Sequence, residues 1–583
     1  MIVKWLTKFW VPILLIFISL LASRDLLLPG YFPMHDDLQM MRQLQLEKCF
    51  KDLQIPCRWV PDMGYGYGFP LFNYYPPLPY LVGQVFRLVG FHFTEVAKII
   101  FLLSIMLSGF TMYLLAKEFW GRFGGVVSAT FYIWAPYHAL DVFVRGAMNE
   151  SWALVWFPLL LWSTYKLIVS TSPAPAKRDH PSSILKWVMI LALAWAALLL
   201  SHNIMVLIFT PVLAVWSLWW LWRTGKFNKV PMLAIGGIWG IGLAAFFTLP
   251  VFFEKNLVHV ETLTQGYYEY IAHFATFKQL FFSRFWGYGA SVWMDGDGMA
   301  FPVGHVHWIL ALVIVVLTIA SIIFKKKKKF NLNLVALVGF LLVVGIGAAF
   351  MAHSRSTPIW LTFPFLSIVQ FPWRFLTLTI FSLSFLAGAL VVLLAPLRVI
   401  GKAIISALLI FLIIFNFNFF RVERTGPVTD QEKFSGEAWR LQQTAGIYDY
   451  LPKGARIAPQ SARKEPLEID SGKAEFSQTK EGTNWLKTNI KVNSDNATVV
   501  VNIFNFPNWK AWIDGKKTEI KVLPKDDLAR ISLLVPQGDH KLEVRLTNTP
   551  IRTVGNMISL ISWFILLRIL WKRKHSFKLS HVK

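Results

Sequence analysis

The feature that most constrains this chain is a series of long apolar segments. Each runs for roughly 17 to 25 residues, the length that an α-helix needs to cross a hydrocarbon core about 30 Å thick. A transmembrane β-barrel would instead show short segments of alternating polarity, so the pattern excludes that class. The sequence therefore predicts a polytopic α-helical membrane protein.

We expect about 12 membrane spans, the number of apolar segments of this length. They lie near residues 9–24, 96–116, 122–138, 151–169, 185–201, 204–222, 231–251, 306–324, 331–351, 374–395, 401–420 and 553–571. The composition agrees, because 55% of the 583 residues are hydrophobic and only 16% are charged, unlike a soluble chain. The first span lacks a small-residue cleavage site, so we interpret it as a retained anchor and not as a signal peptide.

The net charge of +25 does not indicate nucleic-acid binding, because of where the charge lies. Residues 421–550 hold 20 Lys and Arg against 17 Asp and Glu, which leaves 38 against 16 in the rest of the chain. That excess occupies short loops between spans: Lys117 and Arg122; Lys177, Arg178 and Lys186; Arg223, Lys226 and Lys229; residues 325–329; Arg398 and Lys402; and residues 572–574. The predicted spans place all of these loops in the cytoplasm, together with both termini, as the positive-inside rule requires.

A further apolar segment, residues 77–90, cannot be a span in this topology. If it crossed the membrane, every later loop would change sides and the lysine run would lie outside. Its length of about 14 residues and its proline-rich start favour a helix that lies flat at the membrane surface.

The predicted organisation has three parts. Residues 1–420 form a transmembrane domain with outer loops 24–95 and 252–305, and residues 553–583 form the last span and a basic cytoplasmic tail. Between them, residues 421–552 alternate apolar and polar positions and contain turn signals such as Asp514-Gly515. This pattern predicts an extracytoplasmic β-sandwich.

The middle of each predicted span is almost free of ionisable residues. A proton or ion pump needs such residues near the bilayer midplane, where its coupling site lies. The ionisable groups gather on the outer face instead, which favours chemistry at the outer membrane surface on a substrate with a lipid tail.

The first outer loop begins with His35-Asp36-Asp37, about ten residues after the first span. Adjacent carboxylates can serve as a general base, as metal ligands, or as both. Alternatively, Asp37 caps a helix that starts at Leu38. His35 is either a metal ligand or a hydrogen-bonding neighbour of the acids.

The same loop alternates glycine and aromatic residues. Tyr65, Tyr67, Asn73 and Tyr74 belong to this pattern, and such rings can lie on a sugar face or among lipid headgroups. A simple aromatic belt at the membrane surface is the alternative.

The chain has two cysteines, Cys49 and Cys57, both in the first outer loop. Two cysteines exclude a disulfide scaffold and a cysteine-rich metal site. On the oxidising outer side the pair could form a small disulfide, although nothing in the spacing requires one.

Taken together, these features resemble the GT-C glycosyltransferases. The resemblance rests on the acidic pair just after the first span, the aromatic segment 69–79 that leads to the flat helix, and the cytoplasmic turn 113–122. Within this class the chain is most similar to the bacterial YfhO-like proteins, including those labelled as related to 6-pyruvoyl-tetrahydropterin synthase, in segments 370–375 and 506–515. The chain lacks the histidine cluster of a soluble pterin synthase, so that label implies no chemistry.

The resemblance implies an inverting transferase of the cell envelope that takes a sugar from a polyprenyl-phosphate donor at the outer face of a bacterial cytoplasmic membrane. Asp36 or Asp37 would accept the proton of the acceptor hydroxyl. The departing phosphate needs positive charge, for which the outward arginines are candidates: Arg374, Arg145, Arg284 and Arg355. Arg374 is the preferred one, with interfacial anchoring by snorkelling as its alternative.

The second large outer loop supplies further acids. The resemblance places Glu254 and Glu261 near the donor phosphate. Asp295 and Asp297 form an Asp-Gly-Asp-Gly turn, which together with the acidic pair could bind Mg or Mn, although the full calcium-loop pattern is missing.

Two other functions stay open from the sequence. One is a transporter or flippase of lipid-linked precursors, and the other is a non-catalytic scaffold whose β-domain binds glycan. The expected partners are a polyprenyl-phosphate-linked sugar and membrane lipid, without nucleic acid.

Overall fold

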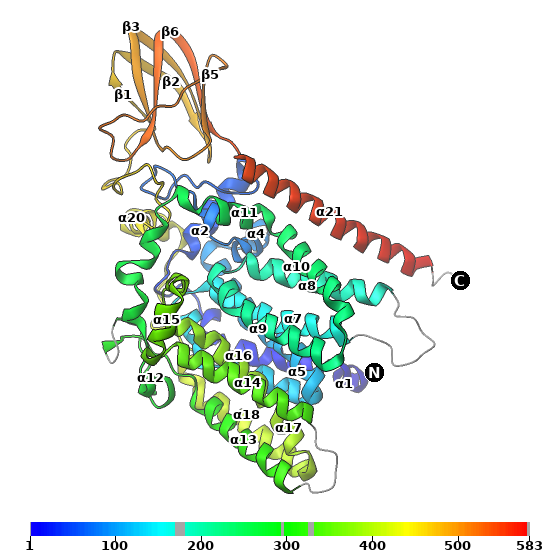
Figure 1. Cartoon of the computed structure of the whole chain (residues 1–583). Helices are drawn as coiled ribbons and strands as arrows, with labels where there is room; N and C mark the ends of the chain where they lie inside the picture. Colours follow the sequence, from blue (N-terminus) through cyan, green and yellow to red (C-terminus); the bar gives the residue numbers. More distant parts are fainter. Residues whose placement is uncertain (1, 170–180, 293–295, 325–331, 580–583) are drawn as a thin grey trace. The chain divides into compact units, whose positions relative to one another are not determined.

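The computed structural model describes residues 2–169, 181–292, 296–324 and 332–579 (Figure 1). The chain forms two compact units, each built from three separate stretches. The first unit contains Met1–Asp37, Thr94–Gly240 and Thr264–Val428, and the second contains Leu38–Phe93, Ile241–Leu263 and Thr429–Lys583. This division differs from the predicted one, because most of the first outer loop and the last helix group with the β-rich region.

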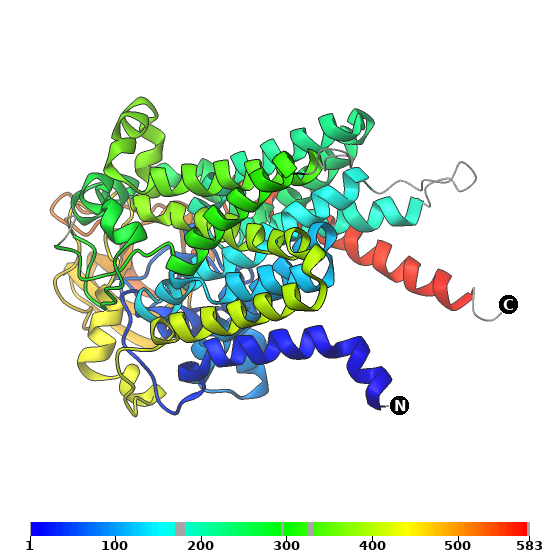
Figure 2. The same ribbon diagram turned by 90° about the horizontal axis from the view of Figure 1, so that it is seen from below.

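The first unit is helical, and its long helices run in roughly parallel and antiparallel directions (Figure 2). They are α1 (Ile2–Ala22), α5 (Phe93–Ile133), α7 (Met148–Val169), α8 (Pro181–Leu199), α9 (Asn203–Thr224), α10 (Val230–Leu243), α13 (His305–Phe324), α14 (Leu332–Met351), α16 (Leu376–Ala387) and α18 (Arg398–Asn416), and the short α17 (Ala389–Leu393) follows α16. Every residue of α16 is buried, and α13 and α14 pack against it. A helix that is buried on all sides lies in the interior, so α16 forms part of the centre of this unit.

The chain is a multi-pass membrane protein by helix length and composition. Among the described residues, eight helices are long and apolar enough to cross a membrane, or up to nine if one bent pair counts as a span. All predicted spans overlap helices, but the count of about 12 is not confirmed. Lys177, Arg178 and the lysine run at 325–329 lie outside the described residues.

Two predicted features of the spans differ in the structure. The predicted span 96–116 and residues 122–133 of the next one belong to one helical stretch, α5, which is interrupted at Gly121 and ends at Ile133. The predicted span 231–251 is two helices, α10 and α11 (Ala245–Phe253), bent by 82°. Apolar length alone cannot show such breaks, because glycine and proline are common in membrane helices.

Gly121 has a backbone conformation that other residues avoid, with φ 72° and ψ 178°. An added Cβ would meet nothing within 4 Å, so the constraint is the dihedral angle and not space. We expect Gly121→Ala to destabilise the protein by about 1–3 kcal/mol. Gly339→Ala in α14 is the matched control, since that site is open and has ordinary helical φ. Equal melting temperatures of the two purified variants in detergent would show that the dihedral angle of Gly121 does not require glycine.

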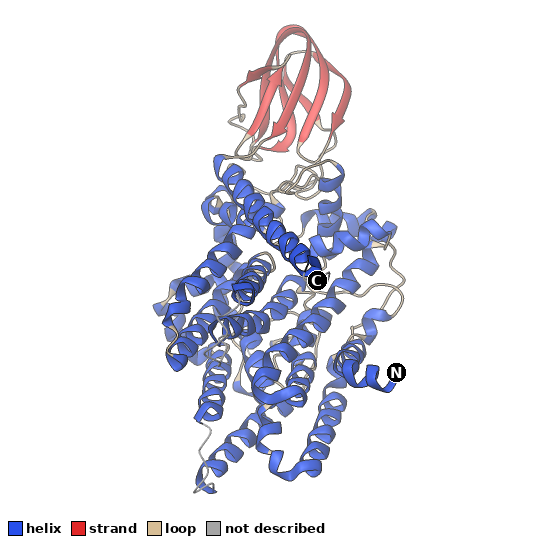
Figure 3. Ribbon diagram, turned by 90° about the vertical axis from the view of Figure 1, so that its right-hand side faces the viewer, coloured by secondary structure: helices blue, strands red, loops and turns tan. Residues whose placement is uncertain are grey.

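The second unit holds all the strands of the described chain (Figure 3) and several helices. The helices are α2 (Gln39–Lys51), α3 (Leu71–Tyr74), α4 (Leu78–Val89), α11, α19 (Asp430–Lys433), α20 (Gly436–Thr444) and α21 (Pro550–Leu579). The predicted flat helix corresponds to α4, which ends at Gly90 with φ 102°. Its position at the membrane surface stays a prediction.

The C-terminal region forms one antiparallel sheet in the order β1-β3-β6-β4-β5, with β2 paired to β3. The strands are β1 (Leu467–Ser471), β2 (Ala474–Glu481), β3 (Trp485–Phe504), β4 (Trp509–Ile513), β5 (Lys516–Thr518) and β6 (Arg530–Leu546). The β-rich prediction is confirmed, but the expected two-sheet sandwich is a single hydrogen-bonded sheet. The reason is the length of β3, whose first half pairs with β2 and whose second half pairs with β1. The stretch before β1 contains α19 and α20 instead of strands.

The first outer loop completes the core of this sheet. Trp59 is buried and lies 5.7 Å from the ring of Phe506 and 5.6 Å from that of Trp509. Cys49 and Cys57 form a disulfide in the same stretch. Large rings bury much apolar surface, so the loop's aromatic content stabilises the second unit.

Candidate functional site

Four charged side chains are buried together in the first unit, and we refer to them as the charged cluster. They are Asp141, Arg145, Glu150 and Arg374, each at most 8% exposed. Glu150 and Arg374 lie at the starts of two membrane-length helices, and Asp141 and Arg145 lie in the short segment before the first of these. Asp141 lies in a π-helical turn, Arg145 follows it, Glu150 lies in the first turn of α7, and Arg374 lies in the 3-10 turn before α16.

Within the charged cluster, Arg145 lies between the two carboxylates. It pairs with Asp141 and, at 2.9 Å from Nη2 to Oε2, with Glu150. The Nε atom of Arg374 lies 3.4 Å from the same Glu150 oxygen. The Tyr137 hydroxyl donates to Oε1 of Glu150 at 2.7 Å. Buried charges need such partners, because removing one member leaves an uncompensated charge.

Arg374 points into the protein. Its Nη1 donates to the Val369 carbonyl and to Oε1 of Gln370, both at 2.8 Å, and its guanidinium lies 4.9 Å from the Phe371 ring. Protein groups therefore hold the guanidinium, and interfacial anchoring by snorkelling stays an untested alternative. Its role in phosphate binding stays a prediction.

The segment that contains the predicted acidic pair is bonded to the backbone next to Arg145. The backbone N–H of His35 donates to the Val144 carbonyl at 3.1 Å, and that of Asp36 donates to the Arg145 carbonyl at 2.9 Å. Gly146 has φ 62°, and a side chain there would collide with Met34. The structure therefore brings together two segments that the sequence placed in separate outer loops.

Asp37 does not cap the next helix as the alternative predicted. Helix α2 begins at Gln39 and its N-cap residue is Leu38, without a side-chain capping bond. The capping alternative for a helix that starts at Leu38 is therefore wrong, because the helix begins one residue later.

Asp297, a predicted metal ligand, lies in a second set of hydrogen-bonded side chains in the first unit. Asp297 accepts from the Val292 backbone N–H at 2.7 Å and from Gln279 at 2.9 Å, and burial raises its pKa. In the same loop, Ser291 contacts Nδ1 of His273 at 2.9 Å and accepts from the Trp373 indole at 3.3 Å.

Trp373 also borders the charged cluster, because the Arg145 guanidinium lies 4.3 Å from its ring. No group of three or more His, Cys, Asp or Glu side chains is placed to hold a metal ion in the described part of the chain. The predicted Mg or Mn site thus has no counterpart among the described side chains. Asp295, the other acid of the predicted turn, lies outside them.

The other arginine candidates have different surroundings. Arg284 donates from Nη2 to the Phe415 carbonyl at 2.8 Å and stacks 3.7 Å from the Phe415 ring. Arg355 is exposed in a short 3-10 turn. Neither pairs with the charged cluster among the described contacts, so Arg145 and Arg374 are the two candidates that the structure brings together.

In the second unit, Glu254 is the centre of another buried ion pair. Arg552 donates from Nε to its Oε2 at 2.9 Å, Asn73 donates to the same oxygen at 3.0 Å, and Thr549 donates to Oε1. The Tyr74 hydroxyl donates to the Glu254 carbonyl at 2.8 Å. Glu254, Asn73 and Tyr74 are therefore joined in the interior of this unit, and their predicted contact with substrate stays untested.

Arg58 adds a second cation to this interior. It donates to the side-chain oxygen of Asn556 at 2.7 Å, to the Phe246 carbonyl at 2.9 Å and to Asn73 at 3.2 Å. Burial, followed by repulsion from Arg552, lowers the pKa of Arg58 to about 9. Glu254 is thus the carboxylate that balances two neighbouring guanidinium groups.

The remaining predicted residues also lie in the second unit. Lys453 donates to Glu261 at 2.6 Å, and this bond lowers the pKa of the exposed Glu261 carboxyl to about 2. Tyr67 packs 5.7 Å from the Phe504 ring, and the Tyr65 hydroxyl accepts from Arg440 at 3.0 Å. Both tyrosines are buried, so their rings serve packing, and a role in sugar binding stays a prediction.

Sequence reasoning missed several buried partners: Tyr137, Asp141, Glu150, Arg58 and Arg552. One signal was present, because Asp141 and Arg145 have the i, i+4 spacing of a helical ion pair. No local pattern indicates Arg552, which lies almost three hundred residues from Glu254.

No protein-family model matches the sequence, and no curated protein is similar to it. Similar solved structures include ArnT from Cupriavidus metallidurans bound to undecaprenyl phosphate, 17% identical over 69% of this chain and 64% of that chain, with a TM-score of 0.34. They also include the oligosaccharyltransferase AglB from Archaeoglobus fulgidus in complex with an inhibitory peptide and a dolichol-phosphate, 14% identical over 79% and 61%, with a TM-score of 0.42. The chain thus spans less than two thirds of either protein. Similarity of this degree does not establish a shared activity, so the proposal below depends on the residues of this chain.

Proposed function

We propose that this protein is a membrane glycosyltransferase that moves a sugar from a polyprenyl-phosphate donor to a cell-envelope acceptor. The reaction takes place at the outer face of a bacterial cytoplasmic membrane, with both termini in the cytoplasm. The observation that carries the proposal is the hydrogen bond from the Asp36 backbone to the Arg145 carbonyl. It supports a site in which the segment of Asp36 lies beside the charged cluster with its two buried guanidinium groups.

In this proposal Asp36 is the general base. Its carboxylate accepts the proton of the acceptor hydroxyl as the hydroxyl oxygen attacks the anomeric carbon. The bond from that carbon to the phosphate oxygen breaks in the same step, so the configuration inverts. A positioned base typically contributes about 10²–10⁴-fold to such a rate.

The charged cluster supplies positive charge for the departing phosphate. Burial raises the pKa of Asp141 well above its ordinary value, and the Glu150 carboxylate adds to this rise. The guanidinium groups of Arg145 and Arg374 both lie within 3.4 Å of one Glu150 carboxylate oxygen. Fixed cations away from water stabilise the charge that develops on a leaving oxygen.

The proposal can be tested by measuring lipid-linked sugars and surface glycans in a strain that lacks this protein. A missing transferase leaves the polyprenyl-phosphate sugar to accumulate and removes one sugar from an envelope component. A missing flippase would trap the donor in the cytoplasmic leaflet, and a missing scaffold would leave donor levels unchanged. Either of the last two results would contradict a transferase.

We expect Arg374→Lys to lower turnover by about 10- to 100-fold, because each charge-assisted contact contributes about 1.5–3 kcal/mol. Lysine keeps the charge but lacks the planar set of donors of a guanidinium. In Arg374 these donors contact Val369, Gln370 and Glu150. Arg355→Lys, at an exposed position, is the control and should retain full turnover. Donor titrations on the purified variants measure both, and equal rates would remove Arg374 from the site.

A further inference from the structure

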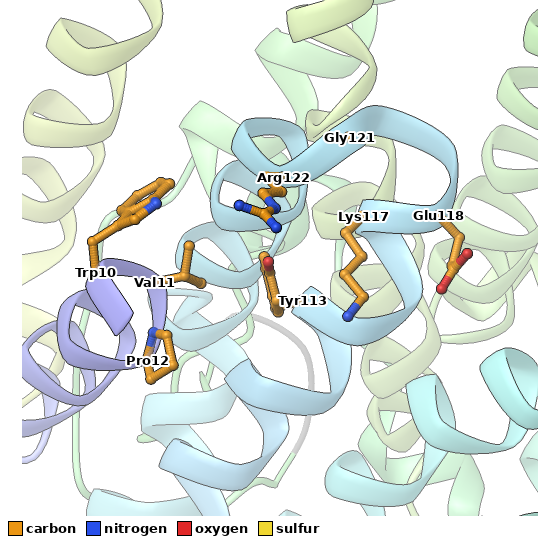
Figure 4. A pocket seen from close by; sticks show the side chains of 8 residues that line it. All are labelled: Trp10, Val11, Pro12, Tyr113, Lys117, Glu118, Gly121 and Arg122. Carbon is orange, nitrogen blue, oxygen red and sulfur yellow. The ribbon is translucent and has the colours of Figure 1, made fainter. Parts of the chain in front are cut away.

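A cavity of about 520 Å³ lies beside the break in α5, within the first unit (Figure 4). Its lining residues are Trp10, Val11 and Pro12 from α1, and Tyr113, Lys117, Glu118, Gly121 and Arg122 from α5. The volume falls within the range of about 300–1,000 Å³ that is usual for small-molecule sites. The proposed transferase reaction uses none of these residues.

The cavity has an excess of positive charge. Glu118, its one acid, accepts from Lys166 at 3.2 Å and from the Trp162 indole at 3.1 Å, and Figure 4 shows its carboxylate turned away from Arg122. The Lys117 amine is attracted by Glu118 and repelled by Lys166 and Arg122. Two cations and one carboxylate, which also bonds to Lys166 and Trp162, leave an excess of positive charge that indicates a site for an anion.

The remaining lining residues shape this site. Gly121 breaks the helix between the two cations, and a side chain there would meet nothing within 4 Å, so the backbone is open to a ligand. The Lys117 amine lies 5.2 Å from the Tyr113 ring, and Figure 4 shows the Tyr113 hydroxyl beside Arg122. Trp10 and Pro12 supply an apolar wall on the other side.

The position of the cavity selects a lipid as the ligand. Helix α5 contains an apolar stretch long enough to cross a membrane, and loop charge predicts that Lys117 and Arg122 lie on the cytoplasmic side. Anionic lipids concentrate in that leaflet, and basic pockets between membrane helices bind their headgroups. We propose that this cavity binds the phosphate headgroup of an anionic membrane lipid, with Lys117 and Arg122 on the phosphate and the acyl chains along the apolar wall.

The alternative is that these cations only orient the helices, which any exposed cytoplasmic cation can do. Thermal stability of the full chain in detergent, titrated with phosphatidylglycerol, separates the two cases. We expect Lys117→Gln/Arg122→Gln to raise the half-saturating lipid concentration at least about tenfold, because the loss of one charge-assisted contact lowers the affinity by about tenfold or more. The half-saturating lipid concentration reports affinity, so it can be compared between the wild type and a variant that is itself less stable.

Arg398→Gln/Lys402→Gln is the matched control, because it removes one Arg and one Lys from exposed positions of another predicted cytoplasmic loop. It should bind like the wild type. An equal loss in both double variants would mean general charge attraction and would overturn the site. Phosphatidylcholine, a net-neutral phosphate ester, should bind weakly. If inorganic phosphate stabilises the wild type at the same concentrations as the anionic lipid, the ligand is a soluble anion and the lipid assignment fails.

Discussion

Asp36→Asn should lower sugar transfer by about 10²–10⁴-fold, the usual contribution of a positioned general base. The amide has nearly the same shape as the carboxylate but cannot accept the proton of the acceptor. The backbone bond from Asp36 to the Arg145 carbonyl does not involve the side chain, so the segment should keep its position. Turnover of purified enzyme, with melting temperature as the folding check, measures the effect.

Asp37→Asn is the control for this prediction. Asp37 is not the N-cap of α2, and the backbone bond to the Arg145 carbonyl belongs to its neighbour. We therefore expect the Asp37 variant to keep turnover within about tenfold of wild type, below the loss of a general base. The reverse order, with Asp37 essential and Asp36 dispensable, would assign the base to the other carboxylate. Full activity in both variants would remove the acidic pair from the mechanism.

Glu254→Gln should destabilise the second unit by about 3–5 kcal/mol, the cost of breaking a buried ion pair by removing one partner. Glu254 is 5% exposed and Arg552 is fully buried. The variant leaves Arg552 and Arg58 without a nearby carboxylate, and the amide cannot offer the same charge to Arg552. The apparent melting temperature of the purified protein should fall accordingly.

Glu261→Gln is the matched control, because it makes the same change seven residues further along. That carboxylate pairs with Lys453 near the surface, and exposed pairs contribute little. The double variant Glu254→Gln/Arg552→Gln should regain part of the lost stability, since it removes the uncompensated cation. Equal melting temperatures for the Glu254 and Glu261 variants would contradict the assigned role of the buried pair.

Membrane-length helices could be predicted because apolar length is a local property of the sequence. The interruption at Gly121 and the bend between α10 and α11 could not, since one glycine inside an apolar segment is compatible with a straight helix. Likewise, alternation predicts that residues of β3 face opposite sides of a sheet. It does not show that one strand is long enough to pair with both β1 and β2.

The sequence indicated Asp36, Arg145 and Arg374 as candidates, but neither their arrangement nor the buried partners Asp141 and Glu150. Asp36 and Arg145 come from different loops, and only the folded chain shows the backbone bond that joins them. The glycine and aromatic alternation around Tyr67 predicted a recognition surface, yet its ring packs against Phe504. Sequence cannot distinguish these two uses, because a ring that packs on a sheet and a ring that stacks on a sugar have the same chemistry.

The most direct test of the central claim uses the purified full chain in lipid nanodiscs, supplied with polyprenyl-phosphate sugars and cell-envelope acceptors. Wild type should release polyprenyl phosphate and transfer the sugar with inverted configuration. Folded Asp36→Asn should show almost no release. Undiminished release by Asp36→Asn, or movement of intact donor across the bilayer without cleavage, would contradict a transferase whose base is Asp36.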